Sequence, residues 1–196
     1  EVITDNELTI FKVSGTAPTS VIETTGRSVP VSTYTLPPNA PQSGTTKVLD
    51  TLDGRNTQAV AGINPSDPTA PQVVWTQHTI DNGAAPTGRS FVRWYEINPR
   101  PGLTPLVYQE QTISDGSLFV FNGAVSPDRR VNGSGRAFGS SNAVIFNTSS
   151  GSTFPAIYGL TKTFMTSQSP WLLIKQSPGF NQDFSERADR RLLERR

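Results

Sequence analysis

The sequence has 196 residues, a formal net charge of +1 and 34% hydrophobic residues, with 16 glycines, 16 prolines and no cysteine. This composition excludes a disulfide framework and thiolate chemistry, and the near-neutral charge gives no reason to expect an anionic partner. No apolar run is long enough to cross a membrane, so we expect no membrane span. The abundance of Gly and Pro favours many short strands joined by turns.

Two strands are expected in the N-terminal part of the chain. The first is the run LTIFKV at residues 8–13, which is followed by the turn residues Ser14-Gly15. The second is Val29–Leu36, where Pro30 favours an edge position or the start of a strand. A proline-rich loop follows at residues 37–44. We interpret residues 1–44 as the outer strands of a preceding four-stranded unit.

Residues 45–113 are expected to form a unit of four strands. The third of these is the densest run of aromatic and β-branched residues, SFVRWYE at residues 90–96. Successive side chains of a strand point to opposite faces. This places Phe91, Arg93 and Tyr95 on one face and Val92, Trp94 and Glu96 on the other. The four expected strands, with turn residues between them, are Thr57–Ile63, Gln72–Ile80, Ser90–Ile97 and Pro105–Gln111.

The same pattern returns in residues 114–178. Phe91–Ile97 aligns with Phe154–Leu160, and Asp53-Gly54 aligns with Asp115-Gly116, both at a spacing of about sixty residues. Two anchors at one spacing indicate a structural repeat. The strands expected in this second unit are Leu118–Val125, Asn142–Asn147, Thr153–Lys162 and Trp171–Gln176.

Four antiparallel strands joined by turns are typical of a blade of a β-propeller. The sequence therefore predicts an all-β chain, a partial β-propeller of about two and a half four-stranded antiparallel blades. A propeller ring closes with four to eight blades, so this number would leave apolar blade faces and strand edges exposed. The strand count also fits the alternative of a β-sandwich.

Several of these strands resemble those of sialidase-like β-propellers in large secreted bacterial proteins, many of which are known as uncharacterised exported proteins. The resemblance rests on the segments Arg93-Trp94-Tyr95-Glu96, Tyr108-Gln109 and Phe154-Pro155-Ala156-Ile157, and it covers about residues 8–184. Ser126-Pro127-Asp128 is similar to a structural Asp-box turn, although the Gly and Trp of that motif are not at their usual places. The resemblance implies a secreted or cell-surface location in bacteria, and further blades on a longer parent chain.

The last eleven residues, 186–196, depart from this resemblance. They hold five Arg and three acidic residues, and they stand where the similar proteins begin their next blade. One hypothesis is an ordinary basic tail, and the other is the remnant of a frameshift. The tail has no interleaved aromatic residues, so nucleic-acid binding is not expected. The first residue, Glu1 rather than Met, favours a piece of a longer protein.

A sialidase would need three arginines around a carboxylate, a Tyr nucleophile with a Glu beside it, and an Asp acid/base. Tyr95 and Glu96 are adjacent on one strand, so their side chains point to opposite faces, and they do not form such a pair. No spacing assigns an arginine clamp among Arg27, Arg55, Arg89, Arg93 and Arg100. The candidate ligand-binding residues are Arg93, Trp94, Tyr95 and Trp75, whose aromatic rings could stack on a sugar, although strand aromatics more often belong to a core.

No cofactor is firmly indicated. The segments Asp81-Asn82-Gly83 and Asp115-Gly116-Ser117 could offer oxygen ligands to calcium, but neither has the spacing of a calcium loop. His78 is the single histidine, and no cysteine or second histidine accompanies it for zinc. No Gly-x-Ser-x-Gly segment supports a Ser-His-Asp triad either. We interpret His78 as a strand side chain on a solvated or half-buried face.

The function expected from these patterns is that of a non-catalytic fragment of an exported β-propeller. It would act as a binding or scaffold module at the cell surface, with a carbohydrate or protein ligand. The alternative is part of a sialidase-like glycoside hydrolase, which would require arginines from several blades to meet at one pocket. A third hypothesis is a free-standing β-sandwich adhesion domain.

Overall fold

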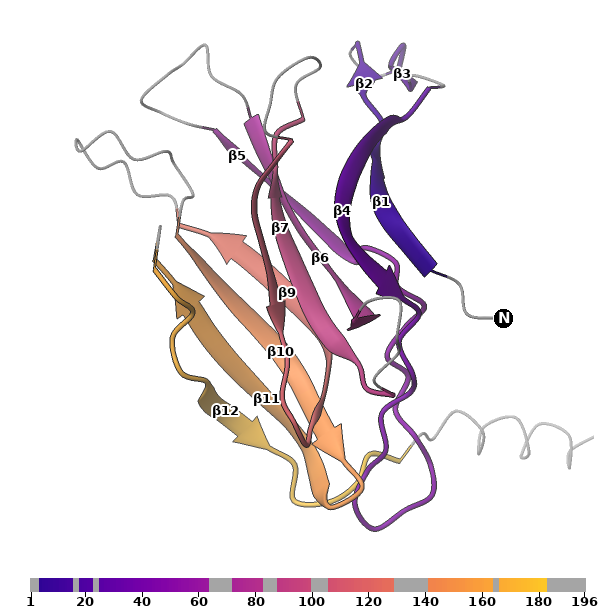
Figure 1. Cartoon of the computed structure of the whole chain (residues 1–196), viewed down its shortest axis with the longest axis vertical. Coiled ribbons are helices and arrows are strands. Elements are labelled where there is room, and N and C mark those ends of the chain that lie inside the picture. Colours follow the sequence, from indigo (N-terminus) through magenta and orange to yellow (C-terminus); the bar gives the residue numbers. More distant parts are fainter. Residues whose placement is uncertain are drawn as a thin grey trace, which may run out of the picture.

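The computed structural model describes residues 4–15, 18–22, 25–63, 72–82, 88–99, 106–128, 141–163 and 166–182. This part of the chain is all-β, as predicted, and contains no helix (Figure 1). Its strands are β1 (Thr4–Ile10), β2 (Val13–Ser14), β3 (Val21–Ile22), β4 (Arg27–Thr35), β5 (Gln58–Ile63), β6 (Gln72–Asn82), β7 (Phe91–Ile97), β8 (Val107–Ile113), β9 (Phe119–Pro127), β10 (Asn142–Ser150), β11 (Thr153–Lys162) and β12 (Leu172–Gln176).

Two large antiparallel sheets contain most of these strands. The first sheet has the order β1-β4-β6-β7-β8, with β5 paired to β6 as well, and the second has the order β12-β11-β10-β9. β2 and β3 form a small separate pair. Among the described residues, neither large sheet closes on itself. Within the first sheet, β5, β6, β7 and β8 are hydrogen-bonded in chain order as one meander, and β9, β10, β11 and β12 form a second meander.

The strand β6 is long enough to serve two partners along one edge. Its first half pairs with β5, from Gln72↔Ile63 to Gln77↔Gln58. Its last residues pair with β4 through Asp81↔Thr35 and Asn82↔Tyr34. The N-terminal strands are therefore hydrogen-bonded to the sheet that contains the first predicted unit. The boundary that we expected near residue 44 is crossed by these bonds.

Beyond this short contact, β1 and β4 turn away and cover one face of the β5–β8 meander. Leu8 and Val29 of this pair share a buried cluster with Tyr95 and Ile97 of β7. The other face of the meander packs against the second sheet. The molecule therefore has three layers, with the meander β5–β8 in the middle, and every residue of β7 is buried.

The largest core lies between the middle layer and the second sheet. Two tryptophans of the middle layer, Trp75 and Trp94, contact valines and aromatic residues of β9, β10 and β11 in one cluster. The strand faces predicted for β7 are confirmed. Val92 and Trp94 belong to this cluster, whereas Tyr95 belongs to the cluster with β1 and β4.

The long connection from β4 to β5 is hydrogen-bonded to the β10–β11 hairpin and to the segment after β12. Ser43 N donates to the Thr153 carbonyl at 3.2 Å, and Ser149 Oγ donates to the Pro41 carbonyl at 2.7 Å. The side chain of Gln42 accepts from Asn181 N at 2.6 Å and donates to the Asn181 carbonyl at 3.4 Å. This double contact, the Gln42–Asn181 clasp, fixes the segment after β12 beneath the second sheet.

Candidate functional site

Two of the predicted ligand-binding residues, Trp75 and Trp94, lie in the core between the two sheets. Their ring centroids are 5.5 Å apart with an interplanar angle of 25°, and both side chains are 0% exposed. The ammonium group of Lys162 lies 5.9 Å from the Trp94 ring centroid and supplies a cation–π contact from the second sheet. A ligand has no open face of either ring to stack on, so their burial does not favour ligand binding, which stays a prediction.

The third candidate, Arg93, points to the opposite side and joins β7 to β4. Its side chain donates to the Ser32 carbonyl at 2.6 Å and to Thr112 Oγ1 at 3.0 Å. Its Nε atom lies 3.6 Å from a carboxylate oxygen of Glu110, which also accepts from Ser32 N. Arg93 is 2% exposed. Its charge is therefore balanced inside the protein by Glu110 and by main-chain carbonyls.

Replacing Arg93 with glutamine should lower the free energy of unfolding by about 2 kcal/mol, because a half-buried Glu110 and the Ser32 carbonyl lose their donor. Urea unfolding followed by tryptophan fluorescence measures this loss. The matched control is Arg55→Gln, since Arg55 pairs with Asp53 on an exposed turn. We expect no measurable change there. Equal losses in both variants would contradict the anchoring role of Arg93.

The fourth candidate, Tyr95, forms a buried pair with His78. His78 Nδ1 lies 2.8 Å from the Gly54 carbonyl, which can only accept, so this nitrogen carries the proton. His78 Nε2 then accepts from the Tyr95 hydroxyl at 2.8 Å. Burial lowers the pKa of His78 to about 4 and raises the pKa of Tyr95. Both side chains are 0% exposed, so the pair fixes the turn at Gly54 against the sheet.

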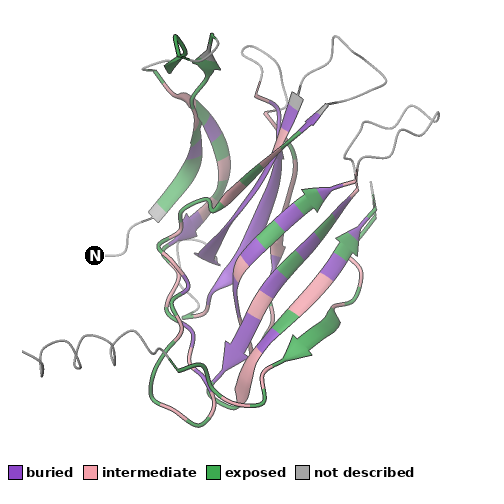
Figure 2. Cartoon of the chain, turned by 180° about the vertical axis from the view of Figure 1, so that it is seen from behind, coloured by how far each residue is buried: buried purple, intermediate pink, exposed green. Residues whose placement is uncertain are grey.

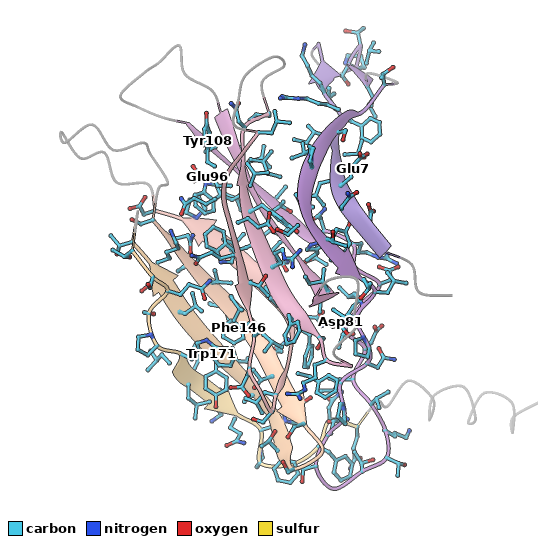
Figure 3. The ribbon with its side chains drawn as sticks, viewed as in Figure 1. Glu7, Asp81, Glu96, Tyr108, Phe146 and Trp171 are labelled. Carbon is cyan, nitrogen blue, oxygen red and sulfur yellow. The ribbon has the colours of Figure 1, made fainter. Side chains whose placement is uncertain are left out.

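Glu96, labelled in Figure 3, belongs to a chain of hydrogen-bonded polar side chains that crosses between the sheets. Its carboxylate accepts from Gln109 Nε2 at 2.6 Å, and Gln109 Oε1 accepts from Lys162 Nζ at 2.5 Å. Burial raises the pKa of Glu96 to about 7, although Gln109 and Lys162 act in the opposite direction. Tyr95 and Glu96 therefore point into different interfaces, as the strand alternation predicts, and cannot act as a nucleophile pair.

The residues of the predicted Asp-box turn lie at the end of a strand. Ser126 is part of β9 and pairs with Ala143. Asp128 follows the strand, and its main-chain N–H donates to the Ser141 carbonyl at 2.7 Å. Residues 129–140 lie outside the described part of the chain, so the turn itself stays a prediction.

The two calcium candidates occupy different settings. Asp115 caps its own turn by accepting from Ser117 N at 2.7 Å and Leu118 N at 2.9 Å, and these bonds lower its pKa. Asp81 accepts from Gly88 N at 2.9 Å. In the described ranges, no three His, Cys, Asp or Glu side chains gather closely enough to hold a metal ion. Calcium binding stays a prediction.

Two further predictions concern the basic C-terminal tail and the absence of a membrane span. The basic tail at residues 186–196 and Arg100 lie outside the described ranges, so the tail hypotheses stay predictions. Among the described residues, none forms a helix with the length and hydrophobicity that a membrane crossing requires.

One face of the second sheet points away from the middle layer and carries exposed apolar side chains. We call it the outer face, and Figure 2 looks onto it. Exposed apolar side chains stand on three of its strands: Ile145 is 50% exposed, Ile157 39%, Leu172 71% and Ile174 51%. Gly159 belongs to this face as well, since a Cβ there would lie 3.2 Å from Ile174 Cδ1.

A groove of about 890 Å³ occupies the lower half of the outer face. Its floor includes Phe121, Asn147 and Ile157, and one rim is made by Phe180 and Asn181 after β12. Asn122 borders the groove at a positive φ of 48°, at the bulge that shifts the β9–β10 register. Sequence reasoning did not identify this surface by residue. The sequence repeat aligns Ile157 with Trp94, and this change from tryptophan to isoleucine was the only sequence difference that pointed to position 157.

Compared with protein-family models, with curated proteins and with solved structures, the chain has no match in any of the three. Its function is therefore argued from the geometry of the chain itself.

Proposed function

We propose that this chain is a non-catalytic scaffold module, a section of a stack of β-sheets of the propeller type carried on an exported bacterial protein. The observation that carries the proposal is the burial of the middle layer on both sides, with all residues of β7 buried. The chain would hold neighbouring parts of a longer protein in a fixed arrangement. The export and the bacterial source rest on the resemblance of the strand sequences alone.

The three-layer arrangement supports a stack over a two-layer sandwich. In a sandwich, each sheet buries one face and turns the other to solvent, so its strands alternate between buried and exposed residues. The strand β10 has such an alternation over Asn142–Phe146, whereas β7 has none. A strand that is buried on both faces needs a neighbour on each side, and a stack of sheets supplies these neighbours.

The alternative of a sialidase-like hydrolase is less well supported. Arg93, the candidate for a substrate clamp, already contacts Glu110 and the Ser32 carbonyl. The Tyr95 hydroxyl donates a hydrogen bond to His78 Nε2 inside the protein. Both groups are therefore already engaged inside the protein.

The chain should therefore release no fluorophore from a fluorogenic sialoside above the rate of a buffer blank. A continuous fluorescence assay with a known sialidase as positive control measures this. Turnover that co-purifies with the chain and disappears in Glu96→Gln, in a variant shown by circular dichroism to be folded, would overturn the scaffold proposal. If turnover persists in Glu96→Gln, the assay is repeated with Arg93→Gln, and loss of turnover in that variant would also overturn the scaffold proposal.

A further inference from the structure

The two meanders can be superimposed strand by strand through their registers. The sequence repeat aligns Trp94 of β7 with Ile157 of β11. Trp94 pairs with Gln77 across β6–β7, and Ile157 pairs with Asn147 across β10–β11. This makes Gln77 equivalent to Asn147.

Two residues earlier in the chain, Trp75 of β6 is equivalent to Ile145 of β10 by the same alignment. The two stacked tryptophans of the middle layer therefore correspond to the two isoleucines at the centre of the outer face.

The equivalent residues differ in what covers them. β9 lies across β5, β6 and β7. Val125 N donates to Gln58 Oε1 of β5 at 3.1 Å, and Asn122 N donates to Thr79 Oγ1 of β6 at 3.0 Å. Both tryptophans are consequently 0% exposed. No strand of the described chain covers the outer face as β9 covers the middle layer, and Ile145 remains 50% exposed.

The opposite faces of the two meanders also correspond. Tyr95 in the middle layer points back toward β1 and β4, and its equivalent Tyr158 points back into the cluster shared with the middle layer. Each layer thus packs its back on the layer before it, and the stacking has one direction. The outward side of β4 is different in character, with Ser28, Pro30 and Ser32 all exposed. One end of the described stack is polar, and the other is apolar.

We propose that the outer face is a docking surface for one further four-stranded antiparallel sheet, whose first strand lies across β10 and β11 as β9 lies across β6 and β7. This inference rests on the proposed scaffold function and names the partner of that scaffold. The exposed apolar residues stand where such a strand would cover them. Glu96, a buried carboxylate of the middle layer, is replaced on the outer face by Gly159, so no carboxylate would be buried at that position.

A sheet stacked in this direction fits better than a second copy of the chain. The surface that would have to dock is the back of a meander, and in a second copy both backs are already covered by β1 and β4 or by the middle layer. A second copy could offer only its own outer face, in the opposite direction. A longer chain can place a fresh meander on the surface without this conflict.

The test inserts a second copy of residues 114–176 directly after Gln176 of the full chain, so that the new meander follows β12 as β9 follows β8. Ile157→Trp serves as the reporter, and it places at 157 the residue found at the equivalent position 94. We expect the reporter to be exposed in the single chain. In the extended chain, its emission should shift to shorter wavelength, and its acrylamide quenching should fall severalfold.

The control reporter is Ser32→Trp on the exposed side of β4, which should be quenched equally in both chains. A reporter at 157 that stays exposed in the folded extended chain would overturn the proposal. Burial of the same reporter in the single chain, increasing with protein concentration, would overturn it in favour of pairing between copies. The sialoside assay is independent of these readouts, so failure of the docking surface can be separated from failure of the scaffold function.

Discussion

Replacing Trp94 with alanine should lower the free energy of unfolding by about 4 kcal/mol, the range found when large buried aromatic side chains are truncated. Trp94 is 0% exposed and contacts both sheets, so its removal leaves a cavity where the layers meet. The loss includes its stack with Trp75 and its contact with Lys162. Urea unfolding, followed by circular dichroism because a fluorophore is removed, measures the change.

Two variants make this result specific to the interface. Trp171 is only half-buried against Phe146 and Tyr158, so Trp171→Ala should cost clearly less. Trp94→Phe should also cost less than Trp94→Ala, because it keeps an aromatic ring in the stack. Within the described chain, the Trp94 indole N–H has no hydrogen-bond partner, so phenylalanine forfeits none. Equal losses at 94 and 171 would contradict a core centred between the sheets.

The second large effect is the pH dependence of stability, to which His78 and Glu96 contribute with opposite signs. Burial lowers the pKa of His78 to about 4 from its ordinary value of 6.5. The unfolded chain therefore binds a proton that the folded chain excludes, and stability falls as the pH drops from 6.5 to about 4. A difference of this size corresponds to about 3 kcal/mol.

Glu96 has the reverse dependence. Burial raises its pKa to about 7 from its ordinary value of 4.5, so the folded protein holds a proton that the unfolded chain releases. Its contribution to stability is present at low pH and is lost as the pH rises from 4.5 to about 7, again by about 3 kcal/mol. Between about pH 4.5 and 6.5 the two slopes oppose each other, and together they contribute little net pH dependence.

Single substitutions should uncover each slope. Relative to the unmodified protein, Glu96→Gln should lose about 2 kcal/mol more stability at about pH 5 than at about pH 6.5, because the His78 slope is then unopposed. His78→Asn, which can still donate toward the Gly54 carbonyl, should show the opposite trend. Urea unfolding at several pH values in this window measures both. Parallel curves for the three proteins would rule out the assigned protonation states.

Much of the fold could be predicted because the two meanders are local. Their strands are short, lie in chain order and are separated by turn residues, so periodicity alone located them within a few residues. The run Phe91–Ile97 also allowed its two faces to be assigned correctly. The path of β1 and β4 could not be predicted, since it depends on Leu8 and Val29 packing against β7 from far along the sequence.

The candidate ligand residues show a limit of composition arguments. Aromatic and arginine side chains on a strand suit a sugar site and a core equally well, and only their surroundings decide between the two. Here Arg93 finds Glu110 across the sheet, and Trp94 is covered by the second sheet. The exposed residues at the centre of the outer face are instead Ile145 and Ile157. Their role in docking is inferred only when each is compared with the tryptophan at the equivalent position of the middle layer.

The Gln42–Asn181 clasp has a consequence for the order in which the chain folds. Its two residues are 139 positions apart, whereas strands within each meander are joined by short connections. Closing a long loop costs more conformational entropy than closing a short one, so contacts distant in sequence form late. The meanders should therefore form first and the clasp afterwards. In native-state hydrogen exchange, the Asn181 amide should exchange through a local opening, well before the amides of β7.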